Sequence, residues 1–290
     1  MPRFDPSQVR HYYDRHTPAF VARGEGRQSG AIHRGVSAPG VRTSGEAIHY
    51  VDDQIAAAIQ SLVSSLPAEA LAETGDARHV VDLGCGVAAS LIRLADHLPI
   101  RGTGVTLSPV QARIAAQKIS AAGLSTRVQC IEADFCALPA TVERADAAFA
   151  IESFVHVGDV PGFFEQCRDL IRPGGLLIIC DDFRGGTTDP AAEQALAQFR
   201  QGWHVNTLLT VDELRDQARA AGFAHESTRD LSPYLHIGRP RDRLIGAFLG
   251  VLKWLPVDAR RFDDLIGGHA LQTCLRQGWI HYQLVVFRRA

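Results

Sequence analysis

The sequence predicts an α/β fold with a doubly wound, seven-stranded, mostly parallel sheet. From residue 79 onward, short apolar runs alternate with stretches of helical spacing, which is typical of βα units. The first apolar run leads into a glycine turn, Gly84-Cys85-Gly86. A last apolar run closes the chain after a long helical insertion. Because connections between parallel strands cover both faces of a sheet, we expect helices on both sides.

The individual elements follow from apolar spacing and from turn signals. Ser108-Pro109 indicates a helix start, since proline is favoured in the first helical turn. Pro173-Gly174-Gly175 predicts a turn that leads into a buried strand. The expected strands cover residues 79–83, 101–107, 127–133, 146–152, 175–182, 225–231 and 280–288. The expected helices between them cover residues 88–97, 109–122, 159–171 and 210–221.

The chain is expected to divide into an N-terminal lid and one larger domain. We expect residues 1–75 to form a lid followed by a helix. Apolar residues have helical spacing around 6–14, within the lid, and again over 46–66. Residues 76–290 form the main domain in this interpretation. A helical insertion over about 233–277 is expected to cover the substrate side.

Composition and charge exclude some classes of function but do not identify one. The 290 residues are 46% hydrophobic and 21% charged, as in an ordinary globular protein. The formal net charge of −2 gives no electrostatic case for nucleic acid or for an anionic membrane. No apolar run reaches the ~20 residues of a membrane span. The N-terminus lacks the apolar core of a secretory signal, so a cytoplasmic protein is expected.

Two further expectations concern the state of the cysteines and the oligomeric state. None of the six cysteines forms a CxxC pair, which favours buried free thiols over a zinc site or a disulfide framework. The N-terminal helix could pack on its own core or on that of a neighbour, so a homo-oligomer stays open.

The glycine turn predicts a site for a nucleoside-bearing cofactor. Asp82 ends the first strand, and Gly84 and Gly86 let the backbone approach a ligand closely. Cys85 lies between the two glycines, and the helix that follows offers free N–H groups. This motif alone also fits a dinucleotide-binding dehydrogenase.

The ends of the next two strands decide between these cofactors. A dehydrogenase would carry an acidic residue at the end of the second strand, but Thr106 stands there, followed by Leu107. The side chains of Thr106, Ser108 and Gln111 could hydrogen-bond a ribose instead. After the third strand, Asp134 could accept from an adenine amino group and Phe135 could lie against the adenine face.

The order of these motifs resembles the class I S-adenosylmethionine (SAM)-dependent methyltransferases over residues 79–182. The resemblance implies a Rossmann-like methyltransferase fold with SAM as the cofactor. Within that superfamily, Gly-Val-Thr-Leu-Ser-Pro-Val-Gln at 104–111 is similar to the sterol, tocopherol and prenyl diphosphate C-methyltransferases. The chain departs from the pattern at Ala88, where the family often has a third glycine.

The end of the fourth strand suggests the catalytic residues. Ile151 and Glu152 lie at the carboxyl edge of the sheet, beside the expected methyl donor. The resemblance implies that Glu152 removes a proton. An alkene that attacks the SAM methyl group becomes a carbocation, which needs aromatic faces and a carboxylate to take a proton. His156 is a second candidate base or a diphosphate ligand.

Further residues are expected around the donor and the acceptor. Tyr12 and Tyr13 belong to a Tyr-Tyr-Asp segment that is similar to the lid of the same family, which implies that Tyr13 contacts the donor and Tyr12 the substrate. Arg34 could bind an anion, as could Arg27 and His33. The arginines of 239–243 could bind a diphosphate directly or through Mg²⁺, although no Asp-rich metal motif is present. The aromatic candidates for a cation pocket include Phe154, Trp203 and Tyr234.

Three hypotheses for the function follow. The leading one is C-methylation of an alkene in a prenyl chain, either a prenyl diphosphate such as geranyl diphosphate or a prenylated natural product, with Glu152 quenching the carbocation. The second is methylation of an aromatic carbon, an oxygen or a nitrogen of a small molecule. The third is a SAM-binding protein that transfers no methyl group.

Overall fold

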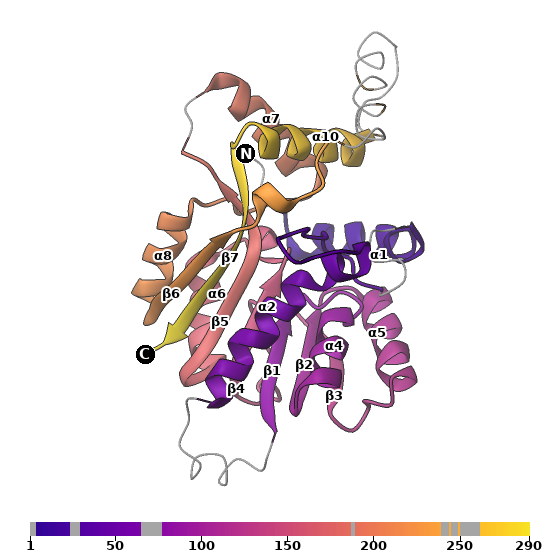
Figure 1. Cartoon of the computed structure of the whole chain (residues 1–290), viewed down its shortest axis with the longest axis vertical. Helices are drawn as coiled ribbons and strands as arrows, with labels where there is room; N and C mark the ends of the chain where they lie inside the picture. The colour runs from indigo at the N-terminus through magenta and orange to yellow at the C-terminus, as the bar shows by residue number, and fades with distance from the viewer. Residues whose placement is uncertain are drawn as a thin grey trace.

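The computed structural model describes residues 4–23, 30–64, 77–186, 189–238, 244, 249 and 262–290. Its centre is a seven-stranded sheet in the order β3-β2-β1-β4-β5-β7-β6 (Figure 1). The strands are β1 (Arg78–Leu83), β2 (Ile100–Thr106), β3 (Val128–Glu132), β4 (Ala145–Ile151), β5 (Ile171–Arg184), β6 (Phe223–Asp230) and β7 (Ile280–Arg289). The predicted α/β fold with a doubly wound sheet is confirmed.

Strands β1 to β5 are parallel, and β7 runs antiparallel between β5 and β6. The carboxyl ends of β1, β2, β3, β4 and β5 therefore meet at one edge of the sheet. In parallel α/β sheets this edge, near the point where the strand order reverses, is where ligands bind. The reversal in this chain lies between β1 and β4.

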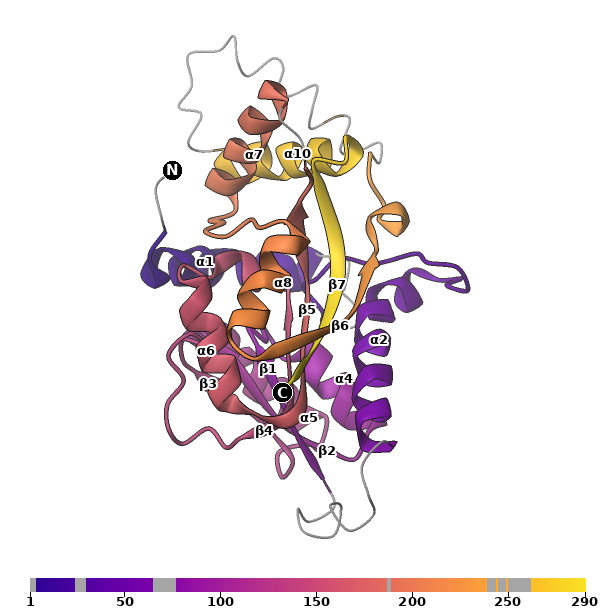
Figure 2. The ribbon, with the colours of Figure 1, turned by 90° about the vertical axis from the view of Figure 1, so that its left-hand side faces the viewer.

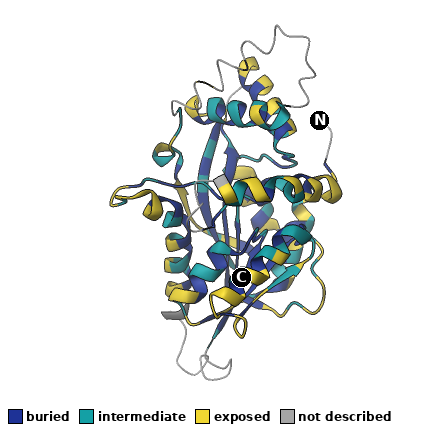
Figure 3. Ribbon diagram, turned by 90° about the vertical axis from the view of Figure 1, so that its right-hand side faces the viewer, coloured by how far each residue is buried: buried dark blue, intermediate teal, exposed yellow. Residues whose placement is uncertain are grey.

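Helices cover both faces of the sheet, which Figure 2 shows nearly edge-on. One apolar core lies under α2 (Ser44–Ser64), α4 (Ala89–His97) and α5 (Pro109–Ala121). The other lies under α6 (Val160–Leu170) and α8 (Val211–Ala220). Figure 3 shows the strands buried and the outer helical faces exposed. Ser108 caps the start of α5, because its side-chain oxygen accepts from the Gln111 backbone N–H at 3.1 Å.

Two helices beyond the carboxyl edge pack on each other. These are α7 (Pro190–Gly202), which the spacing did not predict, and α10 (Asp263–Arg276), which lies within the expected insertion. Their contact is close because a Cβ on Gly202 would lie 2.8 Å from the Gly267 Cα. Of the expected insertion, residues 239–243, 245–248 and 250–261 lie outside the described part of the chain.

Two elements differ from the sequence prediction. Helix α1 (Pro6–Arg23) continues well past residue 14. Strand β5 begins at Ile171, so the expected Pro-Gly-Gly turn lies inside it and appears as a register shift against β4. Gly174, with a φ of +76°, allows this irregularity.

Candidate active site

The turn after β1 fits closely against the end of β4. Gly84 has a φ of +96°, and a Cβ built on it would lie 2.4 Å from the Ser153 Cβ. Ser153 Oγ donates to the Leu83 carbonyl at 2.5 Å, which holds the two segments together. Gly86 also has a positive φ, +52°. Glycine is therefore required at position 84 by both conformation and space.

A cavity of about 580 Å³ opens at this edge of the sheet. Its lining combines the strand ends with α1 and with the segment after α7. The strand-end residues include Asp82, Gly84, Cys85, Gly86, Thr106, Leu107, Ser108, Gln111, Asp134, Phe135, Ile151 and Glu152. The apolar residues on the covering side include Phe4, Pro6, Val9, Tyr12, Phe199, Trp203 and Val205.

The polar groups at the end of β2 bond to one another and to α1. Thr106 Oγ1 donates to Gln111 Oε1 at 2.7 Å, and Gln111 Nε2 donates to Thr17 Oγ1 at 3.1 Å. Ser108 Oγ donates to Asp14 Oδ1 at 2.5 Å. Helix α1 is thus held over the end of β2 by Ser108 and Gln111. Together with Thr106, these are the side chains expected from the sequence to bind a ribose.

Asp134 and Phe135 lie where the third strand meets the cavity. Asp134 Oδ1 accepts from the Cys136 backbone N–H at 2.8 Å, so the carboxylate also closes its own turn. Phe135 is buried and meets Phe163 edge-on at 5.9 Å between ring centroids. An aromatic face and a carboxylate are thereby fixed side by side.

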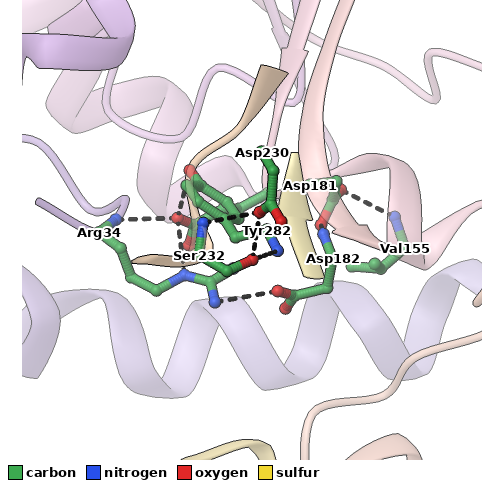
Figure 4. A network of polar contacts seen from close by, with 8 residues as sticks. Arg34, Val155, Asp181, Asp182, Asp230, Ser232 and Tyr282 are labelled. Atoms are coloured by element: carbon green, nitrogen blue, oxygen red, sulfur yellow. Dashed lines mark hydrogen bonds and ion pairs between the residues drawn. The ribbon is translucent and has the colours of Figure 1, made fainter. Parts of the chain in front are cut away.

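Glu152 is held by donors from two distant segments, and Figure 4 labels the two donor residues, Arg34 and Tyr282. Its Oε1 accepts from the Arg34 backbone N–H at 2.8 Å, from Arg34 Nε at 3.1 Å and from the Tyr282 hydroxyl at 3.0 Å. Burial opposes ionisation, but the charges of Arg34 and His33 hold the pKa of Glu152 below its usual value. The residue also has a left-handed φ of +51°. Glu152 is a fixed anion.

Two further carboxyl groups at the end of β5 line the same cavity. Arg34 Nη1 donates to Asp182 Oδ1 at 3.0 Å. Asp181 accepts from the backbone N–H groups of Val155 and Asp182, as Figure 4 shows. Burial raises the pKa of Asp181 well above its usual value. Sequence reasoning missed this pair, although their position at a strand end was the available signal.

His156 lies in a setting that fixes its tautomer. Its Nδ1 is 3.1 Å from the His204 carbonyl oxygen, which can only accept, so Nδ1 carries the proton. Nε2 therefore presents its lone pair to the Tyr13 hydroxyl at 2.7 Å. Burial lowers the pKa of His156 to about 4, so the ring is neutral near pH 7. Both Tyr13 and His156 line the cavity.

Comparison with known proteins places the chain in a family. A family described as "Methyltransferase domain" matches residues 80–175. The 27-O-demethylrifamycin SV methyltransferase of Amycolatopsis mediterranei is 31% identical, over 66% of this chain and 71% of that protein. The chain belongs to the SAM-dependent methyltransferases.

Other relatives of this methyltransferase match over a shorter span or only in fold. An O-methyltransferase of Pyrenophora dematioidea is 29% identical over 50% of this chain, and the match spans about half (54%) of its length. A solved geranyl diphosphate methyltransferase in complex with GPP and sinefungin has a TM-score of 0.72, with 18% identity over 98% of this chain and 99% of the other. At that identity, the likeness shows the fold.

The lining of the methyltransferase cavity suits SAM. It contains more carboxyl groups than basic groups, whereas SAM carries a sulfonium and an ammonium against one carboxylate. Gly84 and Gly86 both line the cavity, so the turn presents its backbone to a ligand there. Every cofactor residue expected from sequence lines this cavity, and their individual contacts with SAM stay predictions.

The expected substrate residues separate into two groups. Tyr12, Trp203 and Arg34 line the cavity. Phe154 does not: it is buried among Phe163, Phe164 and Phe183, because the short helix after Ser153 turns its ring into the core. Tyr234, in the short helix Ser232–Tyr234, packs against the other core and is also absent from the lining. Both rings therefore lie away from the described lining, and their contact with substrate stays a prediction.

Neither a metal cluster nor a membrane helix occurs in the described residues. Within them, no group of three or more His, Cys, Asp or Glu side chains is placed to hold a metal ion. Among the helices that the structure describes, none is long and apolar enough to cross a membrane. The role of Mg²⁺ remains a prediction, and the arginines of 239–243 lie outside the described residues.

Proposed function

We propose that this methyltransferase transfers the methyl group of SAM to a hydroxyl oxygen of a largely apolar small molecule. The observation that carries the proposal is the neutral His156 in the cavity lining. Its Nε2 lone pair accepts from the hydroxyl of Tyr13, which also lines the cavity. A hydroxyl that attacks a methyl group must lose its proton, and a positioned neutral imidazole can take it. The proposal belongs to the second of the hypotheses drawn from sequence.

The chain's own residues define the path of the proton. When bound, SAM supplies an electrophilic methyl group. An acceptor hydroxyl placed next to Tyr13 can donate to the Tyr13 oxygen, while Tyr13 donates to His156 Nε2, or it can replace Tyr13 as the donor to Nε2. The new O–CH₃ bond would form as the bond between the methyl carbon and the sulfonium sulfur breaks, with S-adenosylhomocysteine as the leaving group. The O–H bond of the acceptor breaks as well, and its proton is passed to His156. The His204 carbonyl then stabilises the imidazolium through Nδ1–H.

Charge favours a neutral acceptor over an anionic one. Among the described lining residues, Arg34 is the arginine present, and two carboxylates already pair with it. His33 likewise lies 3.4 Å from Asp52. A diphosphate would meet carboxylates without a spare cation in this part of the lining. The names of the relatives, several of which are O-methyltransferases, support an oxygen acceptor.

Methylation of a prenyl carbon is the second candidate. Glu152 lies in the cavity with Tyr12, Tyr13 and Trp203, and aromatic faces with a carboxylate are what a carbocation requires. In this mechanism the carbocation loses its proton to Glu152. A prenylated but uncharged acceptor would fit the described lining better than a prenyl diphosphate, for the reason of charge given above.

The two candidates are separated by product analysis with methyl-labelled SAM. The acceptors are a panel of apolar phenols and polyketide alcohols on one side and geranyl diphosphate with prenylated phenols on the other. We expect S-adenosylhomocysteine with the hydroxylated panel, and a labelled O–CH₃ signal by NMR. A labelled C–CH₃ on a prenyl chain would overturn the proposal. Bound SAM without turnover on either side would favour a non-catalytic protein.

A matched pair of variants tests the base. His156→Gln should lower kcat by about 10²- to 10⁴-fold, as expected for loss of a general base. Its affinity for S-adenosylhomocysteine should stay near the wild-type value. His97→Gln, at an exposed position in α4, is the control and should retain full turnover. Full turnover in His156→Gln together with its loss in Glu152→Gln would favour the carbocation mechanism instead.

A further inference from the structure

Two thiols from different strands meet beside the donor half of the cavity. Cys85 follows β1 and Cys130 lies on β3, so β2 separates their strands in the sheet. Their sulfur atoms are nevertheless 3.5 Å apart. Both cysteines are free. Sequence spacing gave no sign of the pair, since the residues are 45 positions apart.

Gly104 on β2 makes this contact possible. It pairs in register with Cys130 across the β2–β3 ladder. A Cβ built on Gly104 would lie 2.7 Å from Cys85 Sγ and 3.0 Å from Cys85 Cβ. Because no side chain stands there, Cys85 folds over β2 and reaches Cys130. The glycine thus leaves a gap that the two thiols share.

The environment makes the two sulfurs unequal. The hydrogen bond with Cys85 lowers the pKa of Cys130, whereas the same bond and burial raise the pKa of Cys85. These directions agree with the Cys85 thiol donating to the Cys130 sulfur. Cys130 is half-buried and Cys85 lines the cavity, so a small oxidant can approach the pair. A thiolate beside a second thiol is the arrangement that forms disulfides.

We propose that Cys85 and Cys130 form an oxidation site that reacts with hydroperoxides to give an internal disulfide. Cys130 loses its proton, and the resulting thiolate attacks the peroxide oxygen, forming a sulfenic acid and a hydroxide that takes up this proton as water. Cys85 then attacks that sulfur, its proton leaves with the sulfenic hydroxyl as water, and the S–S bond forms. Two thiols lose two electrons, and hydrogen peroxide is reduced to two molecules of water.

The disulfide changes the cofactor turn. The sulfurs must move from 3.5 Å to a bonded distance of about 2.0 Å. Cys85 lies between Gly84 and Gly86, so this movement displaces the backbone on which the donor half depends. Oxidation is therefore expected to weaken SAM binding, and a bound donor is expected to slow oxidation. Methyl transfer would then slow under oxidising conditions, because the oxidised enzyme binds SAM more weakly.

The experiment measures S-adenosylhomocysteine affinity by calorimetry before and after stoichiometric hydrogen peroxide, and again after dithiothreitol. We expect a loss of at least tenfold on oxidation, which dithiothreitol reverses. Peptide mass mapping should find a Cys85–Cys130 crosslink and a loss of two hydrogens. Protein saturated with S-adenosylhomocysteine before the peroxide should form this crosslink more slowly. Because the readout is donor binding, it does not depend on which acceptor the enzyme uses.

Two single variants complete the test. Cys130→Ala should bind S-adenosylhomocysteine as the wild type does and should keep that affinity after peroxide. Cys136→Ala removes another half-buried thiol on the loop after β3 and should remain as sensitive as the wild type. The proposal is overturned if the crosslinked peptide does not form, if oxidised wild type binds with unchanged affinity, or if Cys130→Ala loses affinity to the same extent.

Discussion

At the scale of single residues, backbone strain gathers at the candidate site. Among the described residues, the non-glycine residues with positive φ are Ala88, Glu152 and His204. Glu152 lines the cavity, His204 supplies the carbonyl that orients His156, and Ala88 begins the helix after the glycine turn. Such conformations cost about 1–3 kcal/mol each and persist where surrounding contacts impose them.

Gly84→Ala should be far more damaging than an alanine at another positive-φ glycine. The added methyl group would lie 2.4 Å from Ser153 Cβ, and overpacking adds roughly 1–3 kcal/mol to the backbone strain. Gly123→Ala is the matched control, because its φ is +70° but no atom lies within 4 Å of the added carbon. Urea unfolding should show a loss about 2 kcal/mol greater for Gly84→Ala. Equal losses would contradict the steric argument.

The pH dependence of turnover should follow His156. Because burial lowers its pKa to about 4, the imidazole is the neutral base at all pH values above that. We expect kcat to be flat between about pH 5.5 and 8 and to fall tenfold per unit below about pH 4. Stopped assays with S-adenosylhomocysteine quantification provide the profile, and circular dichroism at each pH controls for unfolding. A rise in kcat with a midpoint near 6.5 would show a solvent-exposed histidine instead.

The sequence predicts which residues line the cavity well where a strand ends and poorly where the chain turns. Asp82, Thr106 and Asp134 were identified because parallel strands bring their carboxyl ends together. Phe154 lies outside the cavity lining because it is two residues beyond Glu152, in a one-turn helix whose direction the apolar pattern does not reveal. His204 could not be identified at all, since it acts through its backbone carbonyl.

At the scale of elements, α1 is the part that closes the cavity. Phe4, just before it, exchanges two backbone hydrogen bonds with the Asn206 side chain, at 2.7 and 2.8 Å. Asp14 and Thr17 then bond to the donor-side residues Ser108 and Gln111. Sequence patterning predicted the start of this helix but not its length, because its apolar positions are sparse and the tertiary contacts sustain it.

Asp14→Ala should weaken donor binding without disturbing the fold. The substitution removes the hydrogen bond from Ser108, worth about 1 kcal/mol, so the affinity for S-adenosylhomocysteine should fall roughly three- to tenfold. Arg15→Ala, at an exposed position on the same helix, is the control and should bind as the wild type does. Calorimetry measures both. Unchanged affinity in Asp14→Ala would mean that α1 does not contribute to donor retention.

At the scale of the whole molecule, two segments were predictable only in part. The alternating βα pattern determined the sheet because each buried strand and each helix must cover the other's apolar face. The sequence prediction missed helix α7, although its buried residues Ala192, Ala195, Leu196 and Phe199 follow helical spacing. The N-terminal segment is joined to the domain by polar pairs, such as Arg34 with Glu152 and His33 with Asp52, which no periodicity encodes.

The pair of His33 and Asp52 should make stability depend on pH. Asp52 lies on α2, is buried, and is 3.4 Å from His33 Nε2 and 3.0 Å from His49 Nδ1. Burial opposes the charge on His33, yet the nearby carboxylates of Asp52 and Glu152 raise its pKa to about 9. The pKa of Asp52 is lowered in turn. The ion pair between protonated His33 and ionised Asp52 thus holds the N-terminal segment against α2.

The sign of the effect follows from linkage. The pKa of His33 is higher in the folded chain than its free value near 6.5, so its contribution is complete below about pH 6.5 and is lost as the pH rises through 9. Urea unfolding should show stability falling by an amount of the order of 3 kcal/mol across that window. Asp52→Asn should be less stable at pH 6.5 and should have a flatter profile. Asp230→Asn, which breaks the exposed pair with His281, should keep the wild-type slope. The same slope in Asp52→Asn as in the wild type would show that another group titrates.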